Sequence, residues 1–176
     1  MKRKRRDATR GVTIGVLVVG LLAAWLWQEF EDRAALDALS DSEVRCTRVI
    51  DGDTIDVRRA GDTLRVRLMG IDCPETHNQE KGRRQARELG LTYQDLVGLG
   101  KQATRRTRES LEGKAVTLVF EGDDPPLDDY GRALCYVEVD GHDHGEGLLL
   151  EGLAYTRREP HPRMKRYKGA AKKVGQ

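Results

Sequence analysis

The stretch that most constrains this chain runs from Val49 to Thr76 and reads VIDGDTIDVRRAGDTLRVRLMGIDCPET. Apolar and polar residues alternate over residues 54–57 and again over residues 64–68, with Gly61-Asp62 between the two runs. Alternation of period two predicts strands that bury one face, and a Gly-containing pair between two such runs predicts a turn. The stretch therefore predicts a β-hairpin, and residues 44–50 predict a strand before it.

Four charged side chains stand out in this predicted hairpin and the residues just after it. Asp53, Arg67, Asp72 and Glu75 place three carboxylates and one guanidinium within 23 residues. Because successive side chains of a strand alternate between faces, Arg67 is expected on the face opposite to the apolar one. Carboxylate oxygens gathered beside a guanidinium form a site for a hard cation, Ca²⁺ or Mg²⁺, next to a site for an anion. Solvated charges on a hairpin explain any one of these residues, but not the set.

Three separated motifs give a more specific indication. They are Asp51-Gly52-Asp53-Thr54, then Arg67 followed by Asp72-Cys73-Pro74-Glu75, and finally Tyr130-Gly131-Arg132. In these motifs, and over roughly residues 44–155, the chain resembles the staphylococcal nuclease-like (thermonuclease) family. The resemblance implies an α+β fold, an OB-fold five-stranded β-barrel with about three helices. It also implies Ca²⁺-dependent hydrolysis of phosphodiester bonds in DNA and RNA, with little sequence specificity and with 3′-phosphate ends as products.

The same resemblance implies a metal site. Asp53 and Asp72 are the expected side-chain ligands for Ca²⁺, and the backbone carbonyl of Cys73 is the third expected ligand. The family's archetype carries Thr where this chain has Cys73, and a backbone carbonyl tolerates that exchange. Neither a nucleophilic nor a thiolate role is expected for Cys73.

Catalytic roles follow from the resemblance in the same way. Glu75 is expected to orient and deprotonate the attacking water, and the alternative is a surface Glu that caps the following helix. Arg67 and Arg132 are expected to bind the phosphate and to stabilise the extra charge of its transition state. Tyr130 is expected to contact the substrate.

Two segments depart from the family pattern. Residues 77–100 replace a shorter loop and predict a helical turn or two beside the site, although a mobile surface loop is the alternative. Arg157 and Arg158 fall near the place where the archetype carries tyrosines that stack on the substrate base, which favours contacts to the substrate backbone instead. Five basic residues make the first segment a candidate rim for the substrate: Lys81, Arg83, Arg84, Arg87 and Lys101.

The rest of the domain shows ordinary signals for helices and strands. A helix is predicted over residues 101–112, ended by Gly113, because Gly is the preferred residue just after a helix. Further elements are predicted as strands over residues 116–120 and 133–139, a turn at Asp140-Gly141, a helix over residues 146–152 and a final helix within residues 165–176.

Two other groups of residues allow alternatives. His142-Asp143-His144 invites a zinc-site interpretation, but it lacks further ligands at the usual spacing, so polar turn residues are the favoured interpretation. Cys46 and Cys135 fall in the first and fifth predicted strands, which are neighbours in OB-fold barrels. A disulfide between them is therefore possible, and buried free thiols are an equal alternative.

The N-terminus predicts a membrane anchor. MKRKRR precedes 18 uncharged residues, GVTIGVLVVGLLAAWLWQ over residues 11–28. At about 1.5 Å per residue a helix of this length reaches about 27 Å, close to the hydrocarbon thickness of a bilayer. Trp25 and Trp27 stand where an interfacial aromatic belt belongs, and the basic residues before the run place the N-terminus in the cytoplasm. The alternative is a cleaved signal peptide followed by secretion, but no strict A-x-A site follows the run.

These signals divide the chain into four parts. They are a basic cytoplasmic tail (1–10), a transmembrane signal anchor (11–28), an acidic linker (29–43) and an extracytoplasmic OB-fold domain with a basic C-terminal tail (44–176). The net charge is +2 overall, +5 over residues 1–10 and +7 over residues 157–176, so the remaining 146 residues carry −10. A basic tail on an acidic body indicates an anionic partner, although a solvated helix face explains the tail nearly as well.

The sequence thus predicts a membrane-anchored, extracytoplasmic nuclease. Its expected partners are DNA and RNA substrates, preferably single-stranded, together with the membrane, and no obligate protein partner is indicated. The alternative from another class is a noncatalytic OB-fold module that is tethered to the membrane and binds nucleic acid. Such a module is expected to have lost some of the five charged positions, and this chain retains all of them.

Overall fold

The computed structural model describes residues 18–19, 21–22, 24–27, 43–59, 61–121 and 127–175. Two units are separated along the chain, residues 1–38 and residues 39–176. In the first unit, the described residues between 18 and 27 are helical and their side chains are exposed. The expected anchor over residues 11–28 therefore lies mostly outside the described residues, and no helix within them is long and apolar enough to cross a membrane.

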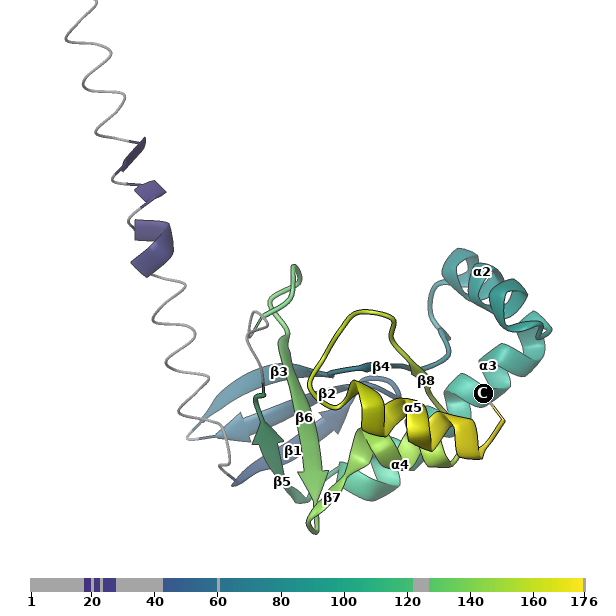
Figure 1. The fold of residues 1–176 in the computed structure, drawn as a ribbon. Coiled ribbons are helices and arrows are strands. Elements are labelled where there is room, and N and C mark those ends of the chain that lie inside the picture. The colour runs from purple at the N-terminus through teal and green to yellow at the C-terminus, as the bar shows by residue number, and fades with distance from the viewer. Residues whose placement is uncertain are drawn as a thin grey trace, which may run out of the picture. The chain divides into compact units, whose positions relative to one another are not determined.

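Five strands of the second unit close into a barrel (Figure 1). They are β1 (Glu43–Val49), β2 (Thr54–Arg59), β3 (Asp62–Leu68), β5 (Ala115–Val119) and β6 (Ala133–Val139). Neighbouring strands pair antiparallel in the order β3-β2-β1-β5-β6, and a parallel pairing of β3 with β6 closes the circle. The expected five-stranded barrel is confirmed, and so is the hairpin of β2 and β3.

The barrel interior is filled by the alternating apolar residues of its strands. Ile55 and Val57 on β2 and Val66 and Leu68 on β3 are almost completely buried. Burying one such side chain contributes about 1.5–3 kcal/mol, so the two strands are strongly fixed in register. A slip by one residue would turn Arg67 into the core, which makes the hairpin register the origin of the site geometry.

Four helices of the described residues accompany the barrel, one more than expected. They are α2 (Gln79–Leu89), α3 (Tyr93–Leu111), α4 (His144–Leu150) and α5 (Met164–Lys173). Figure 1 shows them gathered on one side of the barrel, with α2 farthest from the strands. Helix α3 begins at Tyr93 rather than Lys101, and Gly113 with φ 78° follows its end as predicted.

The segment over residues 77–100 is more ordered than a turn or a mobile loop, and its caps explain why. The side chain of Asn78 accepts a hydrogen bond from Lys81 N at 3.0 Å, and Gly90 ends α2 with φ 68°. The hydroxyl of Thr92 then accepts from Asp95 N at 3.1 Å to begin α3. Capping residues at both ends of a polar segment stabilise helices that its apolar pattern alone would not predict.

Three two-residue strands, β4 (Ile71–Asp72), β7 (His142–Asp143) and β8 (Tyr155–Thr156), complete the fold. β4 pairs antiparallel with β8, so that Asp72 lies opposite Tyr155. This pairing brings the segment after β8 against the segment after the hairpin, where Arg157 N donates to Gly70 O at 3.0 Å.

The cysteines correct one expectation. Cys46, Cys73 and Cys135 are all free and buried. Cys135 lies on β6, whereas the barrel neighbours of β1 are β2 and β5, so the expected adjacency of the strands that carry Cys46 and Cys135 is wrong. Burial raises the pKa of the Cys46 thiol to about 11, as is usual for a thiol within a core.

The histidine pair does not behave as one polar turn. His142 is exposed, and its Nδ1 lies 2.7 Å from Asp140 O in the turn. His144 is instead buried at the start of α4, with its Nε2 3.0 Å from the hydroxyl of Thr107. The turn interpretation is therefore wrong for both histidines, because His142 begins the strand β7 directly after the Asp140-Gly141 turn and His144 begins α4.

Candidate active site

Asp53 is fixed by the loop between β1 and β2. Ile50 N donates to Thr54 O at 2.9 Å, and Asp53 N donates to the Asp51 carboxylate at 3.1 Å. The carbonyl of Asp53 accepts from Leu68 N at 2.8 Å, which ties the loop to the end of β3. Asp53 is only 3 % exposed, so its carboxylate has little freedom.

Gly52 is required in this loop because the loop lies directly on α3 and Cys73. A Cβ atom at residue 52 would lie 2.7 Å from Cys73 Sγ and 2.8 Å from Ala103 Cβ. The hydroxyl of Thr107 donates to Gly52 O at 2.8 Å from the same helix. Helix α3 therefore supports the loop from behind.

Arg67 joins the two predicted metal ligands. Its Nη1 lies 2.7 Å from Asp53 Oδ1 and its Nη2 lies 2.6 Å from Asp72 Oδ1. The guanidinium is 12 % exposed, whereas the Asp72 side chain is 48 % exposed. The structure therefore brings these three predicted residues together, with the open side of the cluster at Asp72.

The electrostatics of Asp53 make it a strong site for a cation. Burial raises the pKa of Asp53 to about 7, and the Asp51 charge also raises it. The Arg67 charge and the hydrogen bond from the Cys73 N–H act in the opposite direction and lower it. A buried carboxylate that is only partly compensated gains stability from additional positive charge.

Cys73 takes part through its backbone. Its N–H donates to Asp53 Oδ2 at 2.7 Å. Burial, followed by the charge of Asp53, raises the pKa of its thiol, which argues against a thiolate at this position. The next residue, Pro74, is held by α3, where a Cβ at Gly100 would lie 2.4 Å from Pro74 O.

Glu75 lies just before α2, but Asn78 and not Glu75 is the N-cap of that helix, so Glu75 bonds the turn that precedes it. Its Oε1 accepts from His77 N at 2.7 Å and from Asn78 N at 3.1 Å. Burial opposes ionisation, but these two N–H groups and the nearby charges lower the pKa of Glu75. Glu75 is therefore an ionised carboxylate whose Oε1 caps a turn and which also lines the groove described below.

Gln85 of α2 was not predicted, yet it contacts two of the predicted residues. Its Oε1 accepts from Glu75 N at 2.8 Å, and its Nε2 donates to Asp72 Oδ2 at 3.2 Å. No motif in the sequence signals this role, because a glutamine within a polar helix is ordinarily a surface residue.

Arg132 is positioned by a partner that the motif analysis also missed. Its Nε and Nη2 lie 2.7 Å and 2.6 Å from Asp128 Oδ2, and its backbone N donates to Asp128 Oδ1 at 2.9 Å. Tyr130 is 81 % exposed, and the Arg132 guanidinium lies 5.3 Å from the centre of its ring. Asp128 stands four residues before Arg132 in LDDYGR, and that spacing is the available sequence signal.

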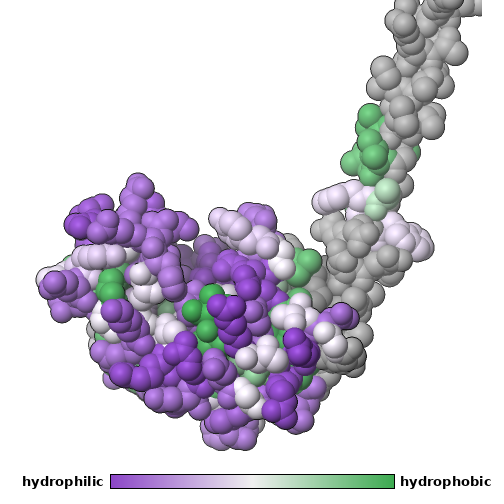
Figure 2. Space-filling view, turned by 180° about the vertical axis from the view of Figure 1, so that it is seen from behind, coloured by the Kyte–Doolittle hydropathy of each residue, from purple (hydrophilic) through white to green (hydrophobic). Residues whose placement is uncertain are grey.

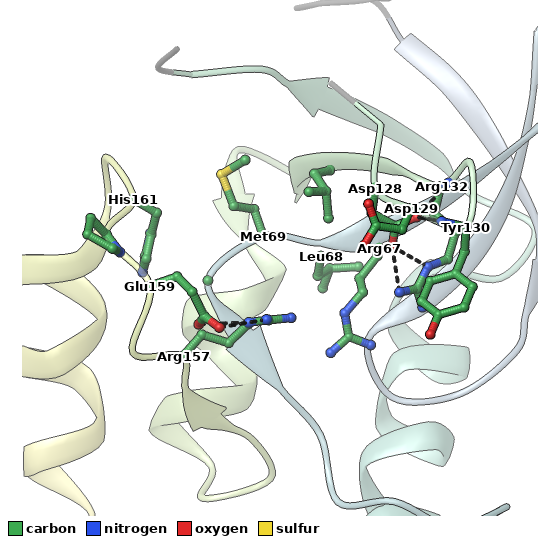
Figure 3. A pocket seen from close by; sticks show the side chains of 13 residues that line it. Arg67, Leu68, Met69, Asp128, Asp129, Tyr130, Arg132, Arg157, Glu159 and His161 are labelled. Atoms are coloured by element: carbon green, nitrogen blue, oxygen red, sulfur yellow. Dashed lines mark hydrogen bonds and ion pairs between the residues drawn. The ribbon is translucent and has the colours of Figure 1, made fainter. Parts of the chain in front are cut away.

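A third arginine faces the same space. Arg157 and Arg67 both line a cavity of about 310 Å³ together with Tyr130 and Arg132. Figure 3 shows Arg67 between Arg157 on one side and the pair Arg132 and Tyr130 on the other. Glu159 fixes Arg157 through bonds of 2.9 Å and 3.1 Å. The departure noted in the sequence therefore adds a guanidinium to the site.

The predicted site residues open onto one larger groove of about 1470 Å³, called the site groove below. Its lining includes Asp53, Arg67, Asp72, Glu75 and Arg132. Acidic residues lie at the metal-ligand end and arginines beside them, an arrangement that suits a phosphate group held near a cation.

The donor set fits a hard cation. Asp53 and Asp72 offer carboxylate oxygens that already lie beside one guanidinium, and Asp72 is open to water. Ca²⁺ takes about 6–8 oxygen ligands and accepts carboxylates, backbone carbonyls and water, so these residues fit it. The described residues contain no cluster of three or more His, Cys, Asp or Glu side chains placed for a metal ion, so waters and carbonyls would complete the ligand set.

Comparisons with known proteins agree with these motifs. Residues 65–175 match the family model described as staphylococcal nuclease homologue. The chain is 32 % identical over 154 residues to a protein named thermonuclease from Staphylococcus intermedius, covering 85 % of this chain and 83 % of that protein.

Two further relatives are matched over a smaller share of their length. An uncharacterized protein from Methanocaldococcus jannaschii is 31 % identical over 117 residues, 62 % of this chain and 56 % of that protein. The SPbeta prophage-derived endonuclease YokF from Bacillus subtilis is 36 % identical over 112 residues, 64 % of this chain and 33 % of that protein. The family match and the relative aligned over most of both chains lead to the same conclusion: this chain belongs to the staphylococcal nuclease homologue family.

Proposed function

We propose that this protein is a nuclease that hydrolyses phosphodiester bonds with the help of Ca²⁺. The observation that carries the proposal is the bridge of Arg67 between Asp53 and Asp72, at 2.7 Å and 2.6 Å, within a groove that also holds Arg132. The names thermonuclease and endonuclease of two relatives support the same reaction class.

Different residues of the groove would bind the metal ion, bind the phosphate and accept the proton. Asp53, Asp72 and the Cys73 carbonyl would hold Ca²⁺, which would supply positive charge for a phosphate oxygen and for activation of water. Arg67 and Arg132 hold the phosphate from two sides and stabilise its transition-state charge. Glu75 accepts the proton of the attacking water through its carboxylate, whose Oε1 is oriented by two backbone N–H groups.

The products and the substrates follow from the family resemblance. We expect cleavage of single-stranded DNA and RNA with little sequence specificity, leaving 3′-phosphate ends. Contacts from Arg67, Arg132 and Arg157 to backbone phosphates would select neither a particular base nor a particular sugar.

The test is hydrolysis by the full chain of a single-stranded DNA and of an RNA, each with Ca²⁺ and with chelator. Cleavage should require Ca²⁺. A phosphatase specific for 3′-phosphates should release phosphate from the new 3′ ends. Full activity in chelator would contradict the metal assignment. Binding without cleavage under both conditions would instead support the noncatalytic OB-fold module.

A second experiment separates the carboxylates. Calorimetric Ca²⁺ titration should show large losses of affinity for Asp53→Asn and Asp72→Asn. Glu75→Gln should retain Ca²⁺ binding and lose turnover at saturating metal. Recovery of the Glu75→Gln rate at high Ca²⁺ would make Glu75 a ligand rather than the group that accepts a proton.

The location of the protein is a separate proposal that rests on sequence alone. Residues 11–28 would anchor it in the membrane, with the N-terminus in the cytoplasm and the OB-fold domain outside. Membranes washed with carbonate should retain the full-length chain, and protease added to spheroplasts should digest the domain. A mature chain that begins after residue 28 would support a cleaved signal peptide.

A further inference from the structure

Two helices that are far apart in the sequence both line the site groove. Helix α2 contributes Lys81 and Arg84, and helix α5 contributes Lys168 and Lys172. Arg157 and Arg158, which follow β8 and precede α5 in the sequence, line the same groove. The cations of the groove therefore continue well beyond the residues that were assigned to the cleaved phosphate.

Most of these cations make no ion pair with a carboxylate that the structure describes. Among the described residues, Lys81, Arg158, Lys168 and Lys172 make no ion pair, and Arg84 lies 4.0 Å from an exposed Glu88. Among the described residues outside the groove, Arg83, Arg87, Lys165 and Lys173 also make no ion pair, so it is the gathering of cations in one groove that distinguishes the first set. Cations left uncompensated in one groove raise its potential and attract a polyanion.

Helix α2 is fixed against the site rather than loosely attached. Gln85 bonds to Glu75 N and to Asp72, as described above. Gly82 approaches so closely that an added Cβ would lie 2.8 Å from the Tyr93 ring and 3.3 Å from Glu75 O. Lys81 and Arg84 therefore stand at fixed places relative to the candidate active site.

One face of the domain offers little apolar surface to a partner. The face in Figure 2 is predominantly hydrophilic, with hydrophobic residues only in small separate patches. Two aromatic rings do lie in the site groove, Tyr130 with 81 % exposure and Tyr155 on β8. Aromatic rings between phosphate-binding cations are the usual platform for unpaired bases, which favours a single strand over a duplex.

We infer that α2 and α5 form two walls of a channel for a single nucleic-acid strand, with Lys81 and Arg84 on phosphates at one side of the cleaved bond and Lys168 and Lys172 on phosphates at the other. The inference rests on the proposed nuclease function and adds to it an extended binding site that includes the α2 helix.

Each wall offers a matched control on its own helix. The groove variants are Lys81→Gln with Arg84→Gln, and Lys168→Gln with Lys172→Gln. The controls are Arg83→Gln with Arg87→Gln on α2, and Lys165→Gln with Lys173→Gln on α5, which are exposed but do not line the groove. Each pair removes the same charge from the same helix, and because Arg83 also lies 5.2 Å from the centre of the Tyr93 ring, urea unfolding checks that this control keeps its stability.

The experiment measures binding of a fluorescently labelled single-stranded oligonucleotide by the full chain in chelator, at several salt concentrations. Each groove variant should reduce the slope of log affinity against log salt by about 1.4, since each lost phosphate contact contributes about 0.7 for a single strand. The controls should keep the wild-type slope. Equal changes in groove and control variants, or no change in either, would overturn the inference.

A short substrate separates this inference from the proposed function. A dinucleotide carries only the cleaved phosphate and lacks the neighbouring phosphates that the two walls would bind, so in Ca²⁺ both groove variants should lose much less rate on it than on a long strand. Failure of the wild type to cleave either substrate would overturn the nuclease function, while the salt slopes would still test the channel. Equal losses of the groove variants on both substrates would place these cations in the chemistry and overturn the channel.

Discussion

Two arginines of this domain are enclosed by carboxylates, and they differ in what surrounds them. Arg67 contacts Asp53 and Asp72 and is 12 % exposed. Arg163, just before α5, contacts Glu121 at 2.5 Å, Glu138 at 2.9 Å and Asp143 at 2.7 Å and is 10 % exposed. The charge type and the degree of burial are nearly the same in both clusters.

Both clusters contain partly exposed carboxylates, since the Glu121 and Glu138 side chains are 36 % and 28 % exposed, so the difference lies in the partners of the buried aspartate and in the groove. Asp143 is 1 % exposed in its side chain and also accepts from the Tyr167 hydroxyl at 2.9 Å and from Glu146 N at 3.0 Å. Arg163 itself lies 4.2 Å from the centre of the Tyr136 ring. In the Arg67 cluster Asp72 is half exposed and faces a groove. An aspartate that is buried and bonded on all sides, like Asp143, holds a helix in place. An aspartate that is exposed to a groove, like Asp72, can accept a ligand.

The largest effect that this comparison predicts is on stability. Arg163→Ala leaves Asp143 buried without its guanidinium, and breaking a buried pair in this way costs about 3–5 kcal/mol. Urea unfolding should show the loss, while the cleavage rate of the protein that remains folded should stay near wild type. Arg166→Ala removes an exposed arginine three residues later on α5 and should cost less than about 1 kcal/mol. An equal cost for both variants would show that the Arg163 cluster is not a special support of α5.

Arg67→Ala should show the reverse pattern. Loss of one donor to the transition state costs about 10²–10³ in rate. The stability loss should be smaller than for Arg163→Ala, because Asp72 is half exposed and Asp53 retains the N–H of Cys73 and the hydroxyl of Thr54. Single-turnover rates beside urea unfolding measure both effects. A variant that unfolds as readily as Arg163→Ala but cleaves normally when folded would make the Arg67 cluster structural too.

The sequence could reveal one cluster and not the other for a simple reason. Asp53, Arg67 and Asp72 lie within 20 residues, and their strand alternation fixes which side each faces. Glu121 and Arg163 lie 42 residues apart on segments that meet only after the barrel has closed. No local period relates them, so tertiary packing alone assembles that cluster.

Helix α2 shows that even contacts between residues close in the sequence can depend on tertiary packing. The caps of α2 and α3 were present in the sequence as Asn78, Gly90 and Thr92, but the polar composition between them predicted only a helical turn or two, with a mobile loop as the alternative. Once α2 forms, Gln85 is carried to Asp72 and Glu75, 13 and 10 residues away. Predicting that contact requires the angle between the α2 segment and the barrel, which local sequence does not specify.

Gln85→Leu should have an intermediate effect that tests whether α2 belongs to the site. The change removes both bonds of the glutamine while keeping a side chain of similar size, so Asp72 and Glu75 lose an orienting partner. Partners of this kind contribute about 10–100-fold to metal affinity or activity. We expect a rate loss near the lower bound, about 10-fold, at saturating Ca²⁺. Glu88→Gln on the same helix also lines the groove and should cleave normally, so a similar loss there would indicate a general effect of α2.

The smallest predicted effect concerns His144, which connects the two clusters. It follows Asp143 directly, and its Nε2 lies 3.0 Å from the Thr107 hydroxyl, which donates to Gly52 O beside Asp53. Because that hydroxyl gives its proton to Gly52, it accepts from His144, so Nε2 of the histidine carries a proton. Burial lowers the pKa of His144 to about 4, the nearby charge of Arg106 lowers it further and that of Asp143 raises it.

The sign of the pH effect follows from that low pKa. An unfolded histidine has a pKa of about 6.5, so below that pH the unfolded chain binds a proton that folded His144 does not. Stability from His144 is complete above pH 6.5 and is lost as the pH falls toward 4, by roughly 1 kcal/mol between pH 6.5 and 5.5. His144→Gln keeps an N–H that can reach Thr107 and does not titrate, so its free energy of unfolding should fall less over this interval. Urea unfolding of both proteins in chelator at pH 7, 6.5 and 5.5 measures the difference, in which the titration of Asp53 cancels. Parallel pH profiles would mean that folded His144 takes up a proton as readily as it does in the unfolded chain. The assignment of a neutral His144 bonded to Thr107 would then be wrong.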